Sequence, residues 1–143
     1  MEAIILLADA AQVADNKLYI LGGGWTITGP APAPSAVAIK LSVSPTEFLT
    51  THRWRLALED QDGRPVLWSN MGTSTPIVVE GELIVTAPSP EDPPGANANI
   101  PLAVTFGPLE LAPGSRYLWR LTIDGETPQG GLAAFGTRPV QVS

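Results

Sequence analysis

The fold class follows from one stretch of the chain, RYLWRLTI at residues 116–123. Every second residue in it is apolar, from Tyr117 through Trp119 and Leu121 to Ile123. Successive side chains of a strand point to opposite faces of a sheet, so this alternation predicts a strand with one buried face.

The same alternation recurs on the N-terminal side of this stretch and in shorter form elsewhere. The long runs are 37–43, 53–59 and 100–106, and the shorter candidates are 4–7, 18–21 and 139–142. Trp54, Leu56, Leu121 and Ile123 are therefore expected in a core. Between residues 77 and 85 the alternation is interrupted by Gly81, where we expect a bulge or a bend.

Turn residues separate these runs, among fifteen prolines and fourteen glycines in 143 residues. Asp15-Asn16, Asp60–Gly63 and Asp124-Gly125 each predict a tight turn between strands. The three glycines at 22–24 predict a bend that lets the chain cross from one sheet to another. No window of eleven or more residues shows sustained helical spacing, and the prolines fall too often for a long helix.

Many short strands with turn signals between them predict an all-β protein. A tyrosine that opens a strand after a turn, as Tyr117 does after Pro113-Gly114, is typical of immunoglobulin-like sandwiches, in which it bonds back to the backbone. An ordinary buried tyrosine after a turn fits the same residues. We expect one domain over residues 1–143, an antiparallel β-sandwich of immunoglobulin-like type.

Composition excludes several classes of function. The net charge is −6, which disfavours a nucleic-acid binder because such proteins collect phosphates on basic patches. No apolar run approaches the roughly 20 residues of a membrane span. The run at 4–10 lacks the basic flank of a secretory signal, so it is interpreted as a first strand. Cysteine is absent. We expect a soluble, cytoplasmic protein with no nucleic-acid or membrane partner.

Residues for catalysis are scarce. His52 is the only histidine, no G-x-S-x-G sequence supplies a nucleophile, and zinc ligands in sets of three or four are missing. His52 stands at the entrance to a strand and is interpreted as a solvent-exposed bystander. We therefore expect no enzymatic activity, no cofactor and no metal.

Two features remain as candidate binding residues. Trp25 and Trp68 lie at segment ends, where an exposed indole is able to stack on a sugar, although packing is the more common role of tryptophan. The longest stretch without a pattern is 87–99. Its residues predicted to contact a partner are Pro90, Glu91, Asp92, Pro93 and Pro94.

The N-terminal segment resembles the opening of a known protein family. The residues that carry the resemblance are Leu6-Leu7-Ala8-Asp9, Lys17-Leu18-Tyr19-Ile20 and Gly22-Gly23-Gly24-Trp25. They are similar to the start of a family of small uncharacterised bacterial and phage-encoded β-sandwich proteins. The resemblance implies a cytoplasmic accessory protein, or a virion protein where it is phage-encoded, and it transfers no site residues.

The function expected from these observations is a non-catalytic structural or assembly role through contact with a protein partner or by self-association. A capsid-decorating component of a phage virion is one form of it. The alternative is a β-sandwich module that binds a small ligand or carbohydrate.

Overall fold

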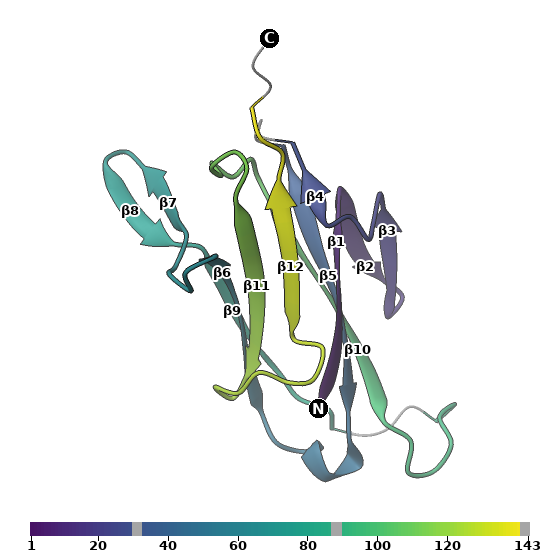
Figure 1. Ribbon diagram of the computed structural model, residues 1–143. Helices are drawn as coiled ribbons and strands as arrows, with labels where there is room; N and C mark the ends of the chain where they lie inside the picture. The colour runs from purple at the N-terminus through teal and green to yellow at the C-terminus, as the bar shows by residue number, and fades with distance from the viewer. Residues whose placement is uncertain (30–32, 87–89, 141–143) are drawn as a thin grey trace.

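Strands make up nearly all of the regular structure in the computed structural model, which describes residues 1–29, 33–86 and 90–140. The one exception within these ranges is a turn of 3₁₀ helix, η1, at Pro45–Glu47. All strand pairs are antiparallel except one. An all-β fold of antiparallel sheets is thereby confirmed (Figure 1).

The larger sheet has five strands in the order β4-β12-β11-β6-β9. Their bounds are β4 Ile27–Thr28, β12 Leu132–Thr137, β11 Arg116–Ile123, β6 His52–Asp60 and β9 Val78–Leu83. The stretch that decided the fold class is the central strand β11, in which Trp119 lies opposite Leu58 on one side and Ala133 on the other. The parallel pair is β4 with β12.

The smaller sheet has three strands in the order β1-β5-β10, and it faces the larger one (Figure 1). Their bounds are β1 Glu2–Ala8, β5 Ser35–Val43 and β10 Ala98–Phe106. Inward residues of both sheets form one hydrophobic core, to which Ile39 and Leu41 contribute from β5 and Leu56 and Leu121 from the other side, all fully buried.

Aromatic rings close this core between the sheets. Phe106 of β10 stacks on Trp119 of β11, with ring centroids 4.7 Å apart and planes 28° apart. Leu121 and Ile123 are buried as expected, whereas Trp54 is half-buried at the edge of the core.

Two hairpins stand outside the two sheets. One is formed by β2 (Ala10–Ala14) and β3 (Lys17–Leu21), the other by β7 (Leu67–Asn70) and β8 (Thr73–Pro76). Each turns through two residues with positive φ, 50° and 57° at Asp15 and Asn16, and 49° and 81° at Met71 and Gly72. This geometry matches the right-handed twist of the flanking strands.

The expected turns are confirmed at the other two places. Asp124 and Gly125 both have positive φ, and the Asp60 carboxylate accepts bonds from the backbone N–H groups of Asp62 and Arg64. The glycines at 22–24 carry the chain from β3 to β4, and so from a hairpin to the larger sheet. The tyrosine bond is also present: Tyr117 Oη accepts from the backbone N–H of Ala112 at 2.7 Å.

Two expectations about strands were wrong. Gly81 makes no bulge, because β9 pairs with β6 without interruption and Gly81 lies opposite Trp54. A Cβ atom at Gly81 would lie 2.6 Å from the Trp54 indole, so the glycine makes room for that ring. Residues 139 and 140 form no strand, and 141–143 lie outside the described residues; the last strand is β12.

Candidate functional site: the β7–β8 arm and the His52 cluster

The β7–β8 hairpin, residues 67–76, is called the arm here because it extends away from both sheets (Figure 1). Its strands pair with each other and with no other described strand. Leu67 is 52% exposed, Trp68 54% and Met71, at the tip, 98%. Apolar side chains are thus presented to solvent on a narrow projecting ribbon.

The arm and the residues that flank it in the sequence are uncharged. Residues 65–79 contain no Asp, Glu, Lys, Arg or His, in a chain with eight basic and fourteen acidic residues. Arg64 and Glu80 are the nearest charges in the sequence. The arm therefore offers a neutral projecting surface to a partner.

Local interactions explain why the arm folds as a hairpin. Trp68 lies opposite Thr75, and the hydroxyl groups of Ser69 and Ser74 are 3.2 Å apart. The Met71-Gly72 turn fixes the register. A two-stranded ribbon on its own is only marginally stable in water, so contact with a further surface would stabilise it.

A hollow of about 310 Å³ lies where the arm meets the body. Trp68 forms one wall, and the start of β9 and the end of β10 form the others. The lining residues are Trp68, Pro76, Ile77, Val78, Val79, Thr105, Phe106, Gly107, Pro108 and Leu109. None of them carries a charge. The sequence singled out Trp68 but not the hairpin; the neutral run with Gly72 between two β-prone segments was the signal for it.

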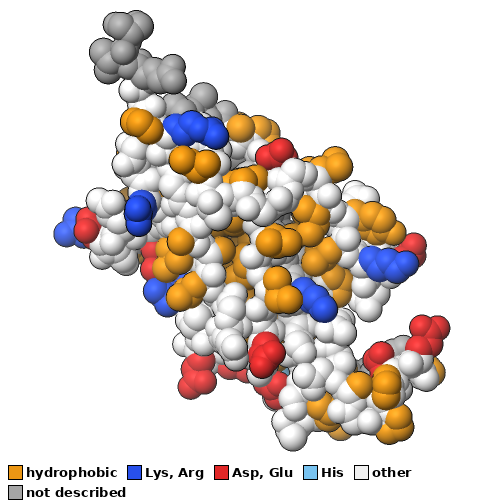
Figure 2. Space-filling model, turned by 45° about the vertical axis from the view of Figure 1, so that its right-hand side comes forward, with side chains coloured by type: hydrophobic (Ala, Val, Ile, Leu, Met, Phe, Trp, Pro, Cys, Tyr) orange, Lys and Arg blue, Asp and Glu red, His pale blue; other side chains and the backbone are white. Residues whose placement is uncertain are grey.

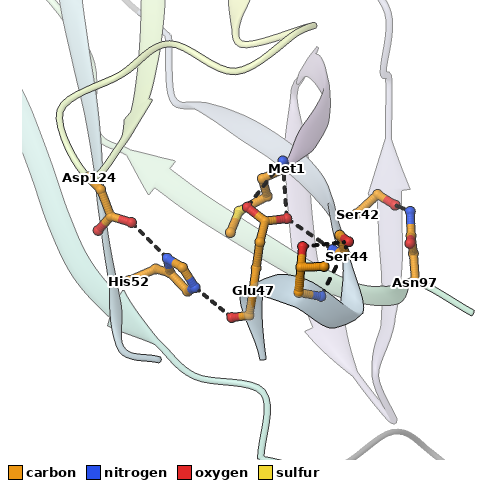
Figure 3. Close-up of polar contacts among 8 residues, drawn as sticks. Met1, Ser42, Ser44, Glu47, His52, Asn97 and Asp124 are labelled. Atoms are coloured by element: carbon orange, nitrogen blue, oxygen red, sulfur yellow. Dashed lines mark hydrogen bonds and ion pairs between the residues drawn. The ribbon is translucent and has the colours of Figure 1, made fainter. Parts of the chain in front are cut away.

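The expectation that His52 is exposed was wrong. Its side chain is 9% exposed, at the start of β6, and both ring nitrogens are within hydrogen-bond distance of an acceptor (Figure 3). Nδ1 lies 2.7 Å from Asp124 Oδ2, and Nε2 lies 2.8 Å from the carbonyl oxygen of Glu47. Because each nitrogen faces an acceptor, the doubly protonated imidazolium fits this site best.

Electrostatics at His52 follow from these partners. The carbonyl of Glu47 and then the carboxylate of Asp124 raise the pKa of His52 above its usual value. The backbone N–H of Arg53 donates to Asp124 Oδ1 at 2.9 Å, and together with His52 it lowers the pKa of Asp124. Asp124 holds this position because the Asp124-Gly125 turn between β11 and β12 has positive φ at both residues.

Glu47 connects the histidine to the N-terminus. Its carboxylate accepts from the backbone N–H of Ser44 at 3.0 Å and lies 3.1 Å from the Met1 ammonium (Figure 3). Burial by itself raises the pKa of Glu47, but the Ser44 and Met1 contacts outweigh it and lower the pKa. The His52 cluster, defined as Met1, Glu47, His52 and Asp124, thus joins four segments at one end of the molecule.

Trp25 lies half-buried against the core, with its ring edge-on to Phe135 at a centroid distance of 5.8 Å. Its indole Nε1 is buried and has no hydrogen-bond partner among the described residues. The adjoining cavity, bounded also by Trp119 and Phe135, measures about 60 Å³. Ligand pockets usually measure about 300–1,000 Å³, so this cavity suits water better than a sugar ring.

The predicted partner loop and the arm lie at opposite ends of the two sheets (Figure 1). Pro90, Glu91, Asp92, Pro93 and Pro94 are all exposed, and residues 87–89 lie outside the described ranges. Asn97 Nδ2, which follows the loop, donates to Ser42 Oγ at 3.0 Å and ties the loop to β5 (Figure 3). The loop and the two tryptophans are not brought together into one site.

A second apolar area lies on the side that carries β1, β12 and the β2–β3 hairpin. Figure 2 shows hydrophobic side chains gathered over the middle of this side. The exposed apolar residues of these strands include Ile4, Leu6, Tyr19, Leu21 and Leu132. In the described part of the chain, no three His, Cys, Asp or Glu residues are grouped to hold a metal, and no helix is long and apolar enough to span a membrane.

Comparison with known proteins gives a family but no activity. No curated protein and no solved structure matches the chain. The model of DUF6941, described as a family of unknown function, matches residues 3–130, a span that includes the arm and most of the His52 cluster. Membership of an uncharacterised family, expected from the N-terminal segment, is thereby confirmed. The chain belongs to DUF6941.

Proposed function

We propose that this chain is a non-catalytic assembly or accessory protein that acts by contact with a protein partner through the arm. The observation that carries the proposal is the arm itself, a neutral projecting hairpin with exposed Leu67, Trp68 and Met71. Exposed tryptophan and methionine are enriched at protein interfaces. A cytoplasmic setting, or a virion one such as capsid decoration, belongs to the same proposal.

Two of the other sheet edges, β9 and β10, differ from the arm in a way that supports this role. Natural sheets discourage pairing with other chains by placing charges or proline on their edge strands. The edge strand β9 carries Glu80 and Glu82, and the edge strand β10 carries Pro101. The arm has no charge, and its one proline is the last residue of β8.

Hydrogen bonding at His52 supports the non-catalytic part of the proposal. A general base needs a ring nitrogen with a free lone pair facing a substrate or nucleophile. Both nitrogens of His52 face acceptors within the protein, and the ring is buried. The cluster is better suited to holding four segments together than to transferring a proton.

Strand order supports an immunoglobulin-like sandwich as the scaffold of this function. In that fold, strands B and E share one sheet and strands C, F and G the other. Assigning B and E to β5 and β10, and C, F and G to β6, β11 and β12, reproduces this division. The bond from Ala112 to Tyr117 then corresponds to the tyrosine corner of strand F.

Binding of a small ligand or carbohydrate at Trp68 is the second candidate. It is favoured by the uncharged hollow of about 310 Å³ beside an indole that is half exposed. Stacking on Trp68 would then replace protein contact as the role of this ring.

Site-specific photo-crosslinking distinguishes these functions. A benzophenone amino acid replaces Trp68 in one variant and Tyr19, an aromatic residue 49% exposed on the other hairpin, in a matched control. Irradiation in the host cells is expected to give a discrete protein adduct from position 68 and none from position 19. Absence of a protein adduct at 68 would overturn the proposal, and an adduct of small mass would favour the ligand.

A further inference from the structure

We propose that the partner of the arm is the arm of a second copy of this chain, paired strand to strand through β7 in antiparallel orientation. This inference rests on the proposed function, because it names the partner for the same surface. The result would be a symmetric dimer in which two two-stranded ribbons form one four-stranded sheet. Closed two-fold symmetry is the commonest arrangement of protein assemblies.

Backbone geometry makes β7 the open edge. In a hairpin with a two-residue turn, bonded and non-bonded residue pairs alternate away from the turn. The bond from Ile77 N–H to the carbonyl of Val66, at 3.0 Å, fixes this alternation. Trp68 therefore bonds to Thr75 across the hairpin, and the N–H and C=O groups of Leu67 and Ser69 point to the free edge.

The other edge of the arm is less suitable. By the same alternation, its outward residues are Ser74 and Pro76. Proline has no N–H to donate, so this edge loses one of the bonds that a neighbouring strand would need. The free edge of β7 offers the N–H and C=O groups of two residues, whereas the free edge of β8 offers both groups of Ser74 and only the C=O group of Pro76.

Strand β7 is complementary to itself. When Leu67 of one copy pairs with Ser69 of the second copy, the two-fold axis places Trp68 opposite Trp68. Four backbone bonds form, in each of which an N–H of Leu67 or Ser69 donates to a carbonyl of the other chain. The two indoles then occupy a non-hydrogen-bonded pair, the position where side chains on neighbouring strands lie closest and aromatic pairs are favourable.

Charge favours a second copy at this surface over one paired at the acidic edge strand β9. Each copy carries a net charge of −6, so two copies repel each other except where neutral surfaces meet. Residues 65–79 are neutral. Pairing of two β9 edges would instead bring Glu80 and Glu82 of one copy close to the same carboxylates of the other.

Sedimentation of the purified chain from about 1 μM to about 1 mM tests the inference, since this range covers dimers of ordinary affinity. The wild type is expected to shift from monomer to dimer mass. Ser69→Pro removes an outward N–H, together with the Ser69 hydroxyl that contacts Ser74 within the arm, and should keep the chain monomeric throughout. Trp68→Lys should weaken dimerisation at least tenfold, and Tyr19→Lys, the control on the other hairpin, should leave it unchanged.

Two further readouts keep the result interpretable. Far-ultraviolet circular dichroism reports on folding of each variant, and paired indoles should add an exciton couplet that grows with dimer fraction. A wild type that stays monomeric, or a dimer unaffected by both Ser69→Pro and Trp68→Lys, overturns the inference. If a monomeric wild type still forms a photo-adduct at position 68 with a different protein, the proposed function stands; without any protein adduct, both fail.

Discussion

The hairpins β2–β3 and β7–β8 both turn through two residues with positive φ, yet one is folded onto the body and the other projects from it. The β2–β3 hairpin lies against β5 and β10 on the outer face of the smaller sheet. Ala36 and Ala38 of β5 point to that face and are still only 1% and 2% exposed. All residues of β8, in contrast, are exposed.

The difference shows that local turn chemistry makes a hairpin, whereas its side chains decide where the hairpin goes. Ala11, Leu18 and Ile20 give β2–β3 an apolar face that is half-buried against the body. The arm alternates Leu and Trp with Ser and Thr on both faces, so neither face favours docking on its own sheets. Its apolar residues remain available to another molecule.

A substitution in the core between the sheets is expected to lower stability more than a substitution in either hairpin. Trp119 is 3% exposed and stacks on Phe106 across the two sheets. Trp119→Ala is expected to lower the free energy of unfolding by about 3–5 kcal/mol, the usual cost of removing a core aromatic ring. Urea denaturation followed by circular dichroism measures it. A loss below about 1 kcal/mol would contradict the packing of the two sheets around this ring.

The His52 cluster is expected to contribute less than the core and in a pH-dependent way. His52→Ala removes the imidazole that bonds to the part-buried carbonyl of Glu47 and to the half-exposed carboxylate of Asp124, which should cost about 1–2 kcal/mol near pH 6. This replaces the expectation of a negligible effect that an exposed histidine would carry.

The sign of the pH dependence follows from the two pKa shifts. The raised pKa of His52 means that its contribution is complete below the ordinary value of 6.5 and is lost as the pH rises through the raised value. The lowered pKa of Asp124 means that its contribution is lost as the pH falls below 3.8. The difference between wild type and His52→Ala should peak near pH 5–6 and narrow toward pH 9. A constant difference would show that the imidazolium is not required.

Burial of the β2–β3 hairpin gives a third effect, similar in size to that at His52. Ile20 is half-buried on its inner face, and a Cβ atom at Gly23 would lie 2.6 Å from its Cγ2. Ile20→Ala should cost about 1–2 kcal/mol, less than the loss at a fully buried site. Tyr19→Ala, one residue away on the exposed face, is the matched control and should change stability by under about 0.5 kcal/mol. Equal effects at the two positions would place the hairpin differently.

Sequence periodicity was sufficient for the strands that bury one face, such as 116–123 and 37–43. It missed β12 and β2, because runs such as Ala133-Ala134 and Ala10-Ala11 have too little contrast in hydrophobicity to show a period of two. Gly81 was misinterpreted because a glycine that accommodates an indole on the next strand has the same sequence signature as a bulge.

The candidate site was only partly predictable, for a physical reason. The partners of His52 are 72 residues away at Asp124 and a main-chain carbonyl at Glu47, and a carbonyl leaves no trace in the sequence. Trp68 was identified as a candidate because a segment end is often exposed. Its position on a projecting hairpin depends on which parts of the two sheets pack against residues 67–76. The local pattern of apolar residues does not show this.

Trp68 should show the smallest effect on stability. Its ring is 54% exposed on a ribbon that pairs with no other described strand. At concentrations where the chain is monomeric, Trp68→Ala should change the free energy of unfolding by less than about 0.5 kcal/mol, whereas the same change at Trp119 costs about 3–5 kcal/mol. Urea denaturation at low protein concentration measures the difference. A loss above about 1.5 kcal/mol would mean that the arm packs on its own body through this ring. The binding role of Trp68 rests on the opposite result, because an exposed apolar side chain that adds little to the stability of its own fold is typical of an interaction site.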